Sequence, residues 1–160
     1  MTFGVFNRAV KISDAAVLLW ARILDALPRA QILLKNAAFE EPAAQNALLT
    51  KFEAHGIAKS RIGFLGKTSR WKHLEAFGRV DISLDPFPQN GGISTWESLQ
   101  MGVPVVGLLG NSIPSRLTGS ILSAVGLDDW VAKTVDDYFA VAVEFASAPS
   151  RPCVLSFRCG

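Results

Sequence analysis

The chain has 160 residues, of which 49% are hydrophobic and 19% are charged. This length suits one domain of ordinary size, and the apolar content is sufficient for a packed core, so the composition excludes an intrinsically disordered chain. The formal net charge is only +2, and the sequence lacks the clustered stripe of Lys and Arg that a nucleic-acid-binding surface would show.

Membrane, secretory and metal signals are weak throughout the chain. No apolar run approaches the roughly 20 residues of a membrane span, and the start lacks the basic segment and long apolar stretch of a signal peptide. We therefore expect a cytoplasmic protein with no membrane partner. Cys153 and Cys159 both lie near the end of the chain and make neither a disulfide framework nor a zinc-binding spacing, so no metal site is expected.

Short apolar runs alternate with longer segments of helical period along the chain. In chain order, the pattern predicts strand 2–6, helix 15–27, strand 30–34, helix 41–55, strand 61–65, helix 69–77, strand 80–84, helix 93–101, strand 103–108, and helices 115–125 and 135–148. Ser13 is the expected N-cap of the first helix, and His55 and Gly56 are expected at the end of the second.

Strands that read as continuous apolar runs, separated by helices, are typical of a parallel sheet covered on both faces. The predicted fold class is therefore α/β, with a single Rossmann-like domain over residues 1–149. Residues 150–160 show no clear period and contain both cysteines. We expect an atypical, poorly ordered tail, and the alternative is an ordered terminal strand.

The segment from Asp85 to Glu97 is the richest in chemistry. It follows an apolar strand and so lies at a strand's carboxyl end, where open α/β sheets bind ligands. Gly91 and Gly92 permit close backbone approach, and the helix start that follows offers free amides, aided by Ser94 and Thr95 hydroxyls, to a phosphate. The alternative is an ordinary Gly-rich turn with Ser94 as a cap.

Two further loops leave the same predicted edge of the sheet. Arg8 and Lys11 follow the first strand and could neutralise a diphosphate, although alone they are better explained as solvated cations. After the third strand, His73 could stack on a base while Arg70 or Lys72 reaches a ribose or phosphate. The alternative is a partly exposed helix histidine.

One more helix start lies beyond a strand's carboxyl end. It begins at Ser115 and Arg116, and the arginine there could bind phosphate or pair with a surface carboxylate. The sequence shows no paired-carboxylate constellation, no Walker P-loop and no G-x-G-x-x-G fingerprint.

A set of ordered motifs resembles the C-terminal catalytic half of the O-GlcNAc transferase / SPINDLY family in its bacterial form. The matching elements are Phe6-Asn-Arg-Ala-Val-Lys-Ile12, Leu19-Trp-Ala-Arg-Ile-Leu24, Arg61-Ile-Gly-Phe-Leu65, His73-Leu74, Gly78-Arg-Val-Asp-Ile-Ser-Leu-Asp-Pro-Phe-Pro88, Asn90-Gly-Gly92, Glu97-Ser-Leu-Gln-Met-Gly-Val-Pro-Val-Val106, Ser115-Arg-Leu117 and Gly126-Leu127. They run in order from about Phe3 to Ala148, and the ordered set is far more specific than any one motif.

The resemblance implies one half of a GT-B fold, whose C-terminal half holds most sugar-nucleotide contacts. By position, Lys11 is expected at the donor diphosphate, beside Arg8, where the animal enzymes have Gln. His73 is expected against the uracil. Arg70 takes the place of a lysine near the ribose, and Glu97 replaces an aspartate that binds the ribose hydroxyls.

The phosphate-binding helix start is carried over in the same way. Ile93 and Ser94 stand where the animal enzymes have threonines, so Ile93 can offer only its backbone amide. The complete predicted nucleotide-sugar site comprises Arg8, Lys11, Arg70, His73, Asn90, Gly91, Gly92, Ile93, Ser94, Thr95 and Glu97. Lys11 is the predicted catalytic residue, and neither a metal nor a cofactor is expected beyond the UDP-sugar donor itself.

The resemblance also bears on the activity. Family members transfer a sugar to Ser or Thr hydroxyls, from either UDP-linked N-acetylglucosamine or GDP-linked fucose, and the donor expected for this chain is UDP-GlcNAc. The family's tetratricopeptide array and N-terminal half are not in this sequence, so we expect a fragment that is inactive alone and whose protein acceptor binds through the missing parts. The alternatives are a non-catalytic nucleotide-binding module or remnant, and the dinucleotide-binding domain of an oxidoreductase, against which the missing glycine fingerprint counts.

Overall fold

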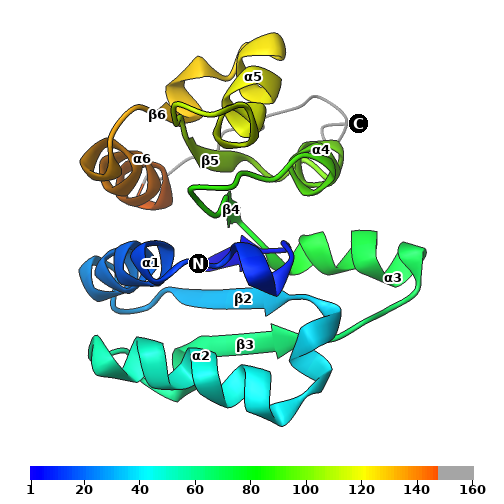
Figure 1. The fold of residues 1–160 in the computed structure, drawn as a ribbon, viewed down its shortest axis with the longest axis vertical. Coiled ribbons are helices and arrows are strands. Elements are labelled where there is room, and N and C mark those ends of the chain that lie inside the picture. Colours follow the sequence, from blue (N-terminus) through cyan, green and yellow to red (C-terminus); the bar gives the residue numbers. More distant parts are fainter. Residues whose placement is uncertain (148–160) are drawn as a thin grey trace.

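The computed structural model describes residues 1–147 and shows one parallel sheet with helices around it. The strands are β1 (Thr2–Val5), β2 (Gln31–Lys35), β3 (Ile62–Leu65), β4 (Ile82–Leu84), β5 (Val105–Leu108) and β6 (Val131–Ala132). All strand pairs within the described residues are parallel, and the order is β3-β2-β1-β4-β5-β6. Figure 1 shows the strands stacked along the long axis of the molecule, with β3 towards one end and β6 towards the other.

The α-helices are α1 (Asp14–Ala26), α2 (Pro42–Ala54), α3 (Arg70–Glu75), α4 (Ile93–Gln100), α5 (Leu117–Ala124) and α6 (Val135–Ser147). Right-handed crossovers place α1 and α2 on one face of the sheet and α3, α4 and α5 on the other, because the chain moves in opposite directions from β1 and from β4. The contacts agree, since α1 packs against both α2 and α6, and α4 packs against α5. The predicted α/β class, the parallel sheet and its cover on both faces are confirmed.

The first helix shows why these residues fold as they do. Ser13 caps α1 as predicted, with its Oγ accepting a hydrogen bond from the amide of Ala16 at 3.1 Å. One side of α1 is buried in the main core, which also takes in the apolar residues of β1, β2, β4 and β5. The opposite side, including Leu18 and Arg22, faces solvent. The 3.6-residue period is therefore read out directly as burial.

The ends of the predicted helices differ from expectation in specific ways. The segment predicted as helix 69–77 is the short α3 followed by a 3₁₀ turn, Ala76–Arg79. Helix α5 begins at Leu117, two residues later than predicted, and the 3₁₀ turn Ile113–Ser115 precedes it. His55 is the C-cap of α2, and Gly56 has φ = +80°, as its expected role requires.

One strand was not predicted. Residues 127–132 were expected only as a connection, whereas Val131 and Ala132 form β6, paired with Gly107 and Leu108 of β5. Two residues are too few for a periodic signal, so this strand exists through its partner rather than through its own pattern. The predicted tail, 150–160 with Cys153 and Cys159, and the last residue of predicted helix 135–148 lie outside the described residues.

Two adjacent leucines of α1 test the packing. Leu19 is 1% exposed and Leu18 is 46% exposed. Leu19→Ala should lower the free energy of unfolding by about 2–5 kcal/mol, because it removes buried methyl groups and leaves a cavity. Leu18→Ala, the same change one residue away, should lower it by less than about 1 kcal/mol. Urea unfolding followed by circular dichroism measures both, and equal effects would contradict the assigned face.

Candidate functional site

The loops that follow β1 and β4 leave the same edge of the sheet and diverge to opposite sides. The chain runs from β1 towards β2 and β3, whereas it runs from β4 towards β5 and β6. Such a switch point leaves a crevice at the carboxyl ends of the strands, which is where open α/β sheets bind ligands. The segments singled out in the sequence, 6–11 and 85–97, meet here.

A pocket of about 360 Å³ occupies this edge. It is lined by Phe6, Asn7, Arg8, Lys35, Asn36, Ala37, Gly66, Lys67, Thr68, Arg70, His73 and Glu97. Four predicted site residues are thus brought together: Arg8, Arg70, His73 and Glu97. A pocket of about 440 Å³ at the opposite edge, beside Met1 and residues 27–30, is lined by none of the predicted residues, so chemistry rather than size identifies the candidate site.

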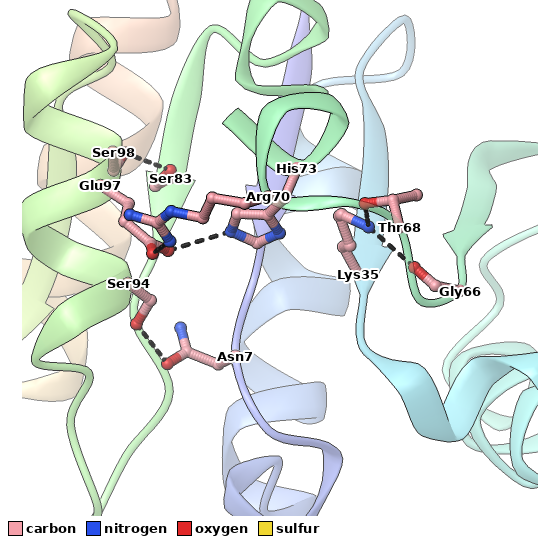
Figure 2. A network of polar contacts seen from close by, with 10 residues as sticks. All are labelled: Asn7, Lys35, Gly66, Thr68, Arg70, His73, Ser83, Ser94, Glu97 and Ser98. Atoms are coloured by element: carbon pink, nitrogen blue, oxygen red, sulfur yellow. Dashed lines mark hydrogen bonds and ion pairs between the residues drawn. The ribbon is translucent and has the colours of Figure 1, made fainter. Parts of the chain in front are cut away.

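The carboxylate of Glu97 is the centre of this pocket's polar network. Glu97 is 6% exposed, and it receives an ion pair from Arg70 and a 2.9 Å contact from Nε2 of His73. Figure 2 shows Arg70 and His73 both pointing from α3 towards Glu97 on α4. The buried carboxylate is therefore held by two partners, as a charge in a poorly solvated place requires.

Aromatic packing fixes the ring of His73. Its centroid lies 5.8 Å from that of Phe6 and 5.7 Å from that of Phe77, the latter edge-on. The side chain keeps 23% of its surface exposed. One ring nitrogen is thus engaged by Glu97, while His73 still lines the pocket.

The turn before α4 is built around Asp85. Its carboxylate is buried and accepts hydrogen bonds from the amide of Gly91, at 2.8 and 3.0 Å, and from the hydroxyl of Thr118 at 2.8 Å. The hydroxyl of Tyr138 donates to the backbone carbonyl of Asp85 at 3.0 Å. The hydroxyl of Ser13 donates to the carbonyl of Phe87 at 2.6 Å, so the turn is tied to α1, α5 and α6.

Burial raises the pKa of the Asp85 carboxyl to about 7, against the opposing effects of hydrogen bonds from Thr118 and Gly91 and of the Lys11 charge. Lys11 itself donates from Nζ to the backbone carbonyl of Asn90 at 2.6 Å. The predicted catalytic lysine therefore lies against the turn that the sequence assigned to phosphate. Lys11 does not line the 360 Å³ pocket, so it lies to one side of the Glu97 network.

The remaining predicted residues divide into two groups. Ser94 faces the crevice, where its Oγ donates to Oδ1 of Asn7 at 2.8 Å, and Ile93 is 76% exposed. The side chains of Asn90 and Thr95 are instead buried, and the hydroxyl of Thr95 meets that of Thr118 at 3.0 Å. Asn90 is 0% and Thr95 is 1% exposed, so these two predicted site residues support the turn from within.

The loop after β5, with the predicted helix start at Ser115 and Arg116, does not line the pocket. Ser115 is buried and its backbone carbonyl accepts from the amide of Gly110 at 2.8 Å. Arg116 and Lys72 are exposed and do not line the pocket.

Sequence reasoning missed several residues that shape the site. Lys35 and Asn7 line the pocket, and the buried side chains of Thr118 and Tyr138 hold the turn. Lys35 had a usable signal, because it ends an apolar strand at the carboxyl edge. Thr118 and Tyr138 carried none, since they lie 33 and 53 residues from Asp85 in the chain.

Comparison with known proteins decides the family. A model described as glycosyl transferase family 41 matches residues 1–153. This chain belongs to that family. The resemblance to O-GlcNAc transferase and SPINDLY drawn from the motifs is confirmed, and with it the assignment to one Rossmann-like half of a GT-B glycosyltransferase.

Individual family 41 relatives agree. The chain is 37% identical over 148 residues to a protein of Hordeum vulgare named as a probable UDP-N-acetylglucosamine–peptide N-acetylglucosaminyltransferase SPINDLY, covering 92% of this chain and 16% of that one. It is 26% identical over 147 residues to the UDP-N-acetylglucosamine–peptide N-acetylglucosaminyltransferase of Caenorhabditis elegans, covering 92% and 12%. The chain therefore spans about a sixth or less of the length of these relatives.

Solved structures give the same fold. A mutant O-GlcNAc transferase of Thermobaculum terrenum superposes with a TM-score of 0.91 at 34% identity, covering 92% of this chain and 28% of that one. Anabaena Alr3699/HepE, solved with UDP and glucose, superposes with a TM-score of 0.51 at 16% identity, covering 89% and 41%, and supports the fold alone.

The described residues contain neither a membrane-spanning helix nor a cluster of metal ligands. Within residues 1–147, no helix is long and apolar enough to span a membrane. The same residues contain no group of three or more His, Cys, Asp or Glu side chains gathered as a metal site would need.

Gly91 provides a test of how tightly the turn is built. A Cβ added there would lie 2.6 Å from Oδ1 of Asp85, 2.7 Å from Oγ of Ser94 and 2.8 Å from Oγ1 of Thr95. Gly91→Ala should therefore lower the free energy of unfolding by about 1–3 kcal/mol through overpacking. Gly92→Ala is the matched control, because a Cβ there meets no atom within 4 Å, and a similar loss in both variants in urea unfolding would refute the contact geometry.

The raised pKa of Asp85 predicts a pH dependence of stability. An unfolded aspartate titrates near about 3.9, so the folded chain binds this proton more tightly, and the contribution of Asp85 is present at low pH and is lost as pH rises towards about 7. Asp85→Asn cannot titrate. The free energy of unfolding of the variant should therefore rise relative to wild type by on the order of 1 kcal/mol or more between about pH 5 and about pH 7.5.

The control for this titration is Asp25→Asn, which changes an exposed carboxyl on α1. It removes the same kind of carboxyl from an exposed position. Denaturant unfolding at several pH values measures all three proteins, and parallel curves for Asp85→Asn and wild type would show that Asp85 does not titrate in this window.

Proposed function

We propose that this chain is the donor-binding half of a protein O-glycosyltransferase that transfers N-acetylglucosamine from UDP-N-acetylglucosamine to Ser or Thr hydroxyls. The observation that carries the proposal is the pocket at the switch point, where Arg8, Arg70, His73 and Glu97 converge in a member of glycosyl transferase family 41. The choice of donor and of a peptide acceptor follows the names of the barley (Hordeum vulgare) and nematode (Caenorhabditis elegans) relatives.

The pocket chemistry suits the proposed ligand. Glu97 can accept hydrogen bonds from a ribose diol, and the part-exposed ring of His73 can pack against a base. The amides at the start of α4, from Gly92 to Ser94, lie at the positive end of the helix dipole, which favours the binding of phosphate. Arg8 and Arg70 add positive charge beside this path, so the arrangement complements a nucleoside diphosphate with its sugar.

Lys11 is the proposed catalytic residue. Transfer of the sugar leaves negative charge on the nucleotide diphosphate, and a cation held beside the phosphate-binding turn lowers the energy of that charge as it develops. The 2.6 Å bond from Nζ to the carbonyl of Asn90 holds the ammonium against this turn. Because the chain covers 28% of the Thermobaculum enzyme, we assign donor binding to this part and the transfer step to the complete enzyme with its acceptor protein.

Binding of nucleotides tests the proposal directly. Titration calorimetry on the folded chain should detect UDP or GDP binding and a clear preference for these over NADH. A folded sample that binds none of them would favour a non-catalytic remnant. A preference for NADH would favour the dinucleotide-binding alternative.

The role of Lys11 has its own test. Lys11→Ala should weaken UDP binding by about 1 kcal/mol or more, roughly fivefold or more in Kd, because a charge-assisted contact to phosphate is lost. Lys59→Ala is the matched control. Lys59 pairs with Glu53 and lies just before the amino end of β3, whereas the pocket lies at the carboxyl ends of the strands. An unchanged Kd for Lys11→Ala would remove Lys11 from the site.

A further inference from the structure

Lys35 is a buried cation in the candidate pocket that the proposed function leaves unused. It is the last residue of β2, is 4% exposed, and lines the pocket together with Asn36 and Ala37. Burial lowers the pKa of its ammonium group, and the charge of Glu40 opposes this effect. A poorly hydrated ammonium group gains more from an additional acceptor than a surface lysine does.

The hydrogen bonds of Lys35 fix the loop after β3. Nζ donates to the backbone carbonyl of Gly66 at 2.7 Å and to Oγ1 of Thr68 at 2.9 Å. Oε1 of Glu40 also accepts a hydrogen bond from the amide of Lys67, at 3.1 Å. Hydrogen bonds from Lys35 and to Glu40 thus hold residues 66–68, and these residues form one wall of the pocket.

An ammonium group has three N–H donors. Within the described residues, two of those of Lys35 have partners, and the side chain borders the pocket. In the view of Figure 2, His73 is seen between Glu97 and Lys35. If Glu97 takes the ribose and the start of α4 takes the phosphates, the end of the pocket formed by residues 35–37 and 66–68 remains for the base.

We propose that Lys35 reads the nucleobase, using its third N–H to select a base with a carbonyl oxygen on its Watson–Crick edge. The inference rests on the proposed function and deepens it. Uracil (O4) and guanine (O6) present a carbonyl acceptor where cytosine (N4) and adenine (N6) present an amino donor. A lysine N–H can bond a carbonyl oxygen but repels an amino group. It therefore favours uracil over cytosine among pyrimidines and guanine over adenine among purines.

Wild-type selectivity is the primary test and depends on no variant. Titration calorimetry compares UDP with CDP and GDP with ADP, pairs that match in ring size, ribose and phosphate. At least one keto nucleotide should bind about tenfold or more tightly than its amino partner. Equal affinities within both pairs would overturn the proposal, and which pair discriminates tells uracil from guanine.

A variant then assigns the selectivity to Lys35. Lys35→Met keeps the length of the side chain and removes its donors. The UDP:CDP or GDP:ADP affinity ratio should fall towards one, with most of the loss on the keto nucleotide. Lys72→Met is the matched control, because Lys72 is exposed and does not line the pocket. It removes the same charge and should leave the ratio unchanged.

The outcomes separate the inference from the function on which it rests. If UDP and GDP bind the wild-type chain but Lys35→Met retains the wild-type ratio with a cooperative thermal transition, Lys35 does not read the base and the proposed function stands. If the folded wild-type chain binds none of the four nucleotides, both fail. The ratio cancels general losses of charge or stability, because these weaken both nucleotides of a pair alike.

Discussion

The carboxylate of Asp85 holds together the part of the molecule where a ligand can bind. It leaves the end of β4 pointing inward, and its bonds to the amide of Gly91 and the hydroxyl of Thr118 fold the following loop back on itself. Gly91 can lie there only because it has no side chain, since Asp85, Ser94 and Thr95 already surround the space that a Cβ would take. The position and direction of α4, and therefore of Glu97, follow from this one turn.

Charge is distributed unevenly around the pocket that results. Four cationic side chains line it, those of Arg8, Lys35, Lys67 and Arg70, against the single carboxylate of Glu97. Such a balance favours an anionic ligand with at least one group that donates hydrogen bonds to a carboxylate. A nucleoside diphosphate sugar fits both demands, which is why the electrostatics and the family membership lead to the same proposal.

The pocket is built from several separate elements of the fold. Loops after β1, β2 and β3 and the helices α3 and α4 each contribute a wall, while the core residues of the sheet beneath contribute rigidity. Buried pairs away from the pocket, such as Ser83 with Ser98 at 2.7 Å, tie α4 to β4 (Figure 2). Rigid support of this kind keeps site residues in place before a ligand arrives, so less ordering is required on binding.

The sequence by itself determined the α/β class, the order of the first five strands and of the helices, and the edge of the sheet that carries the candidate site, because apolar periodicity, caps and glycines act over a few residues. Its ordered motifs also determined the family. The pairing that makes β6 a strand and the side-chain partners chosen across the fold could not be read from it. The bonds of Asn7 to Ser94 and of Arg70 to Glu97 span 87 and 27 residues. Tertiary structure alone turned Thr95 inward to Thr118 and brought Lys35 into the pocket, because such contacts depend on how distant elements pack rather than on any local pattern.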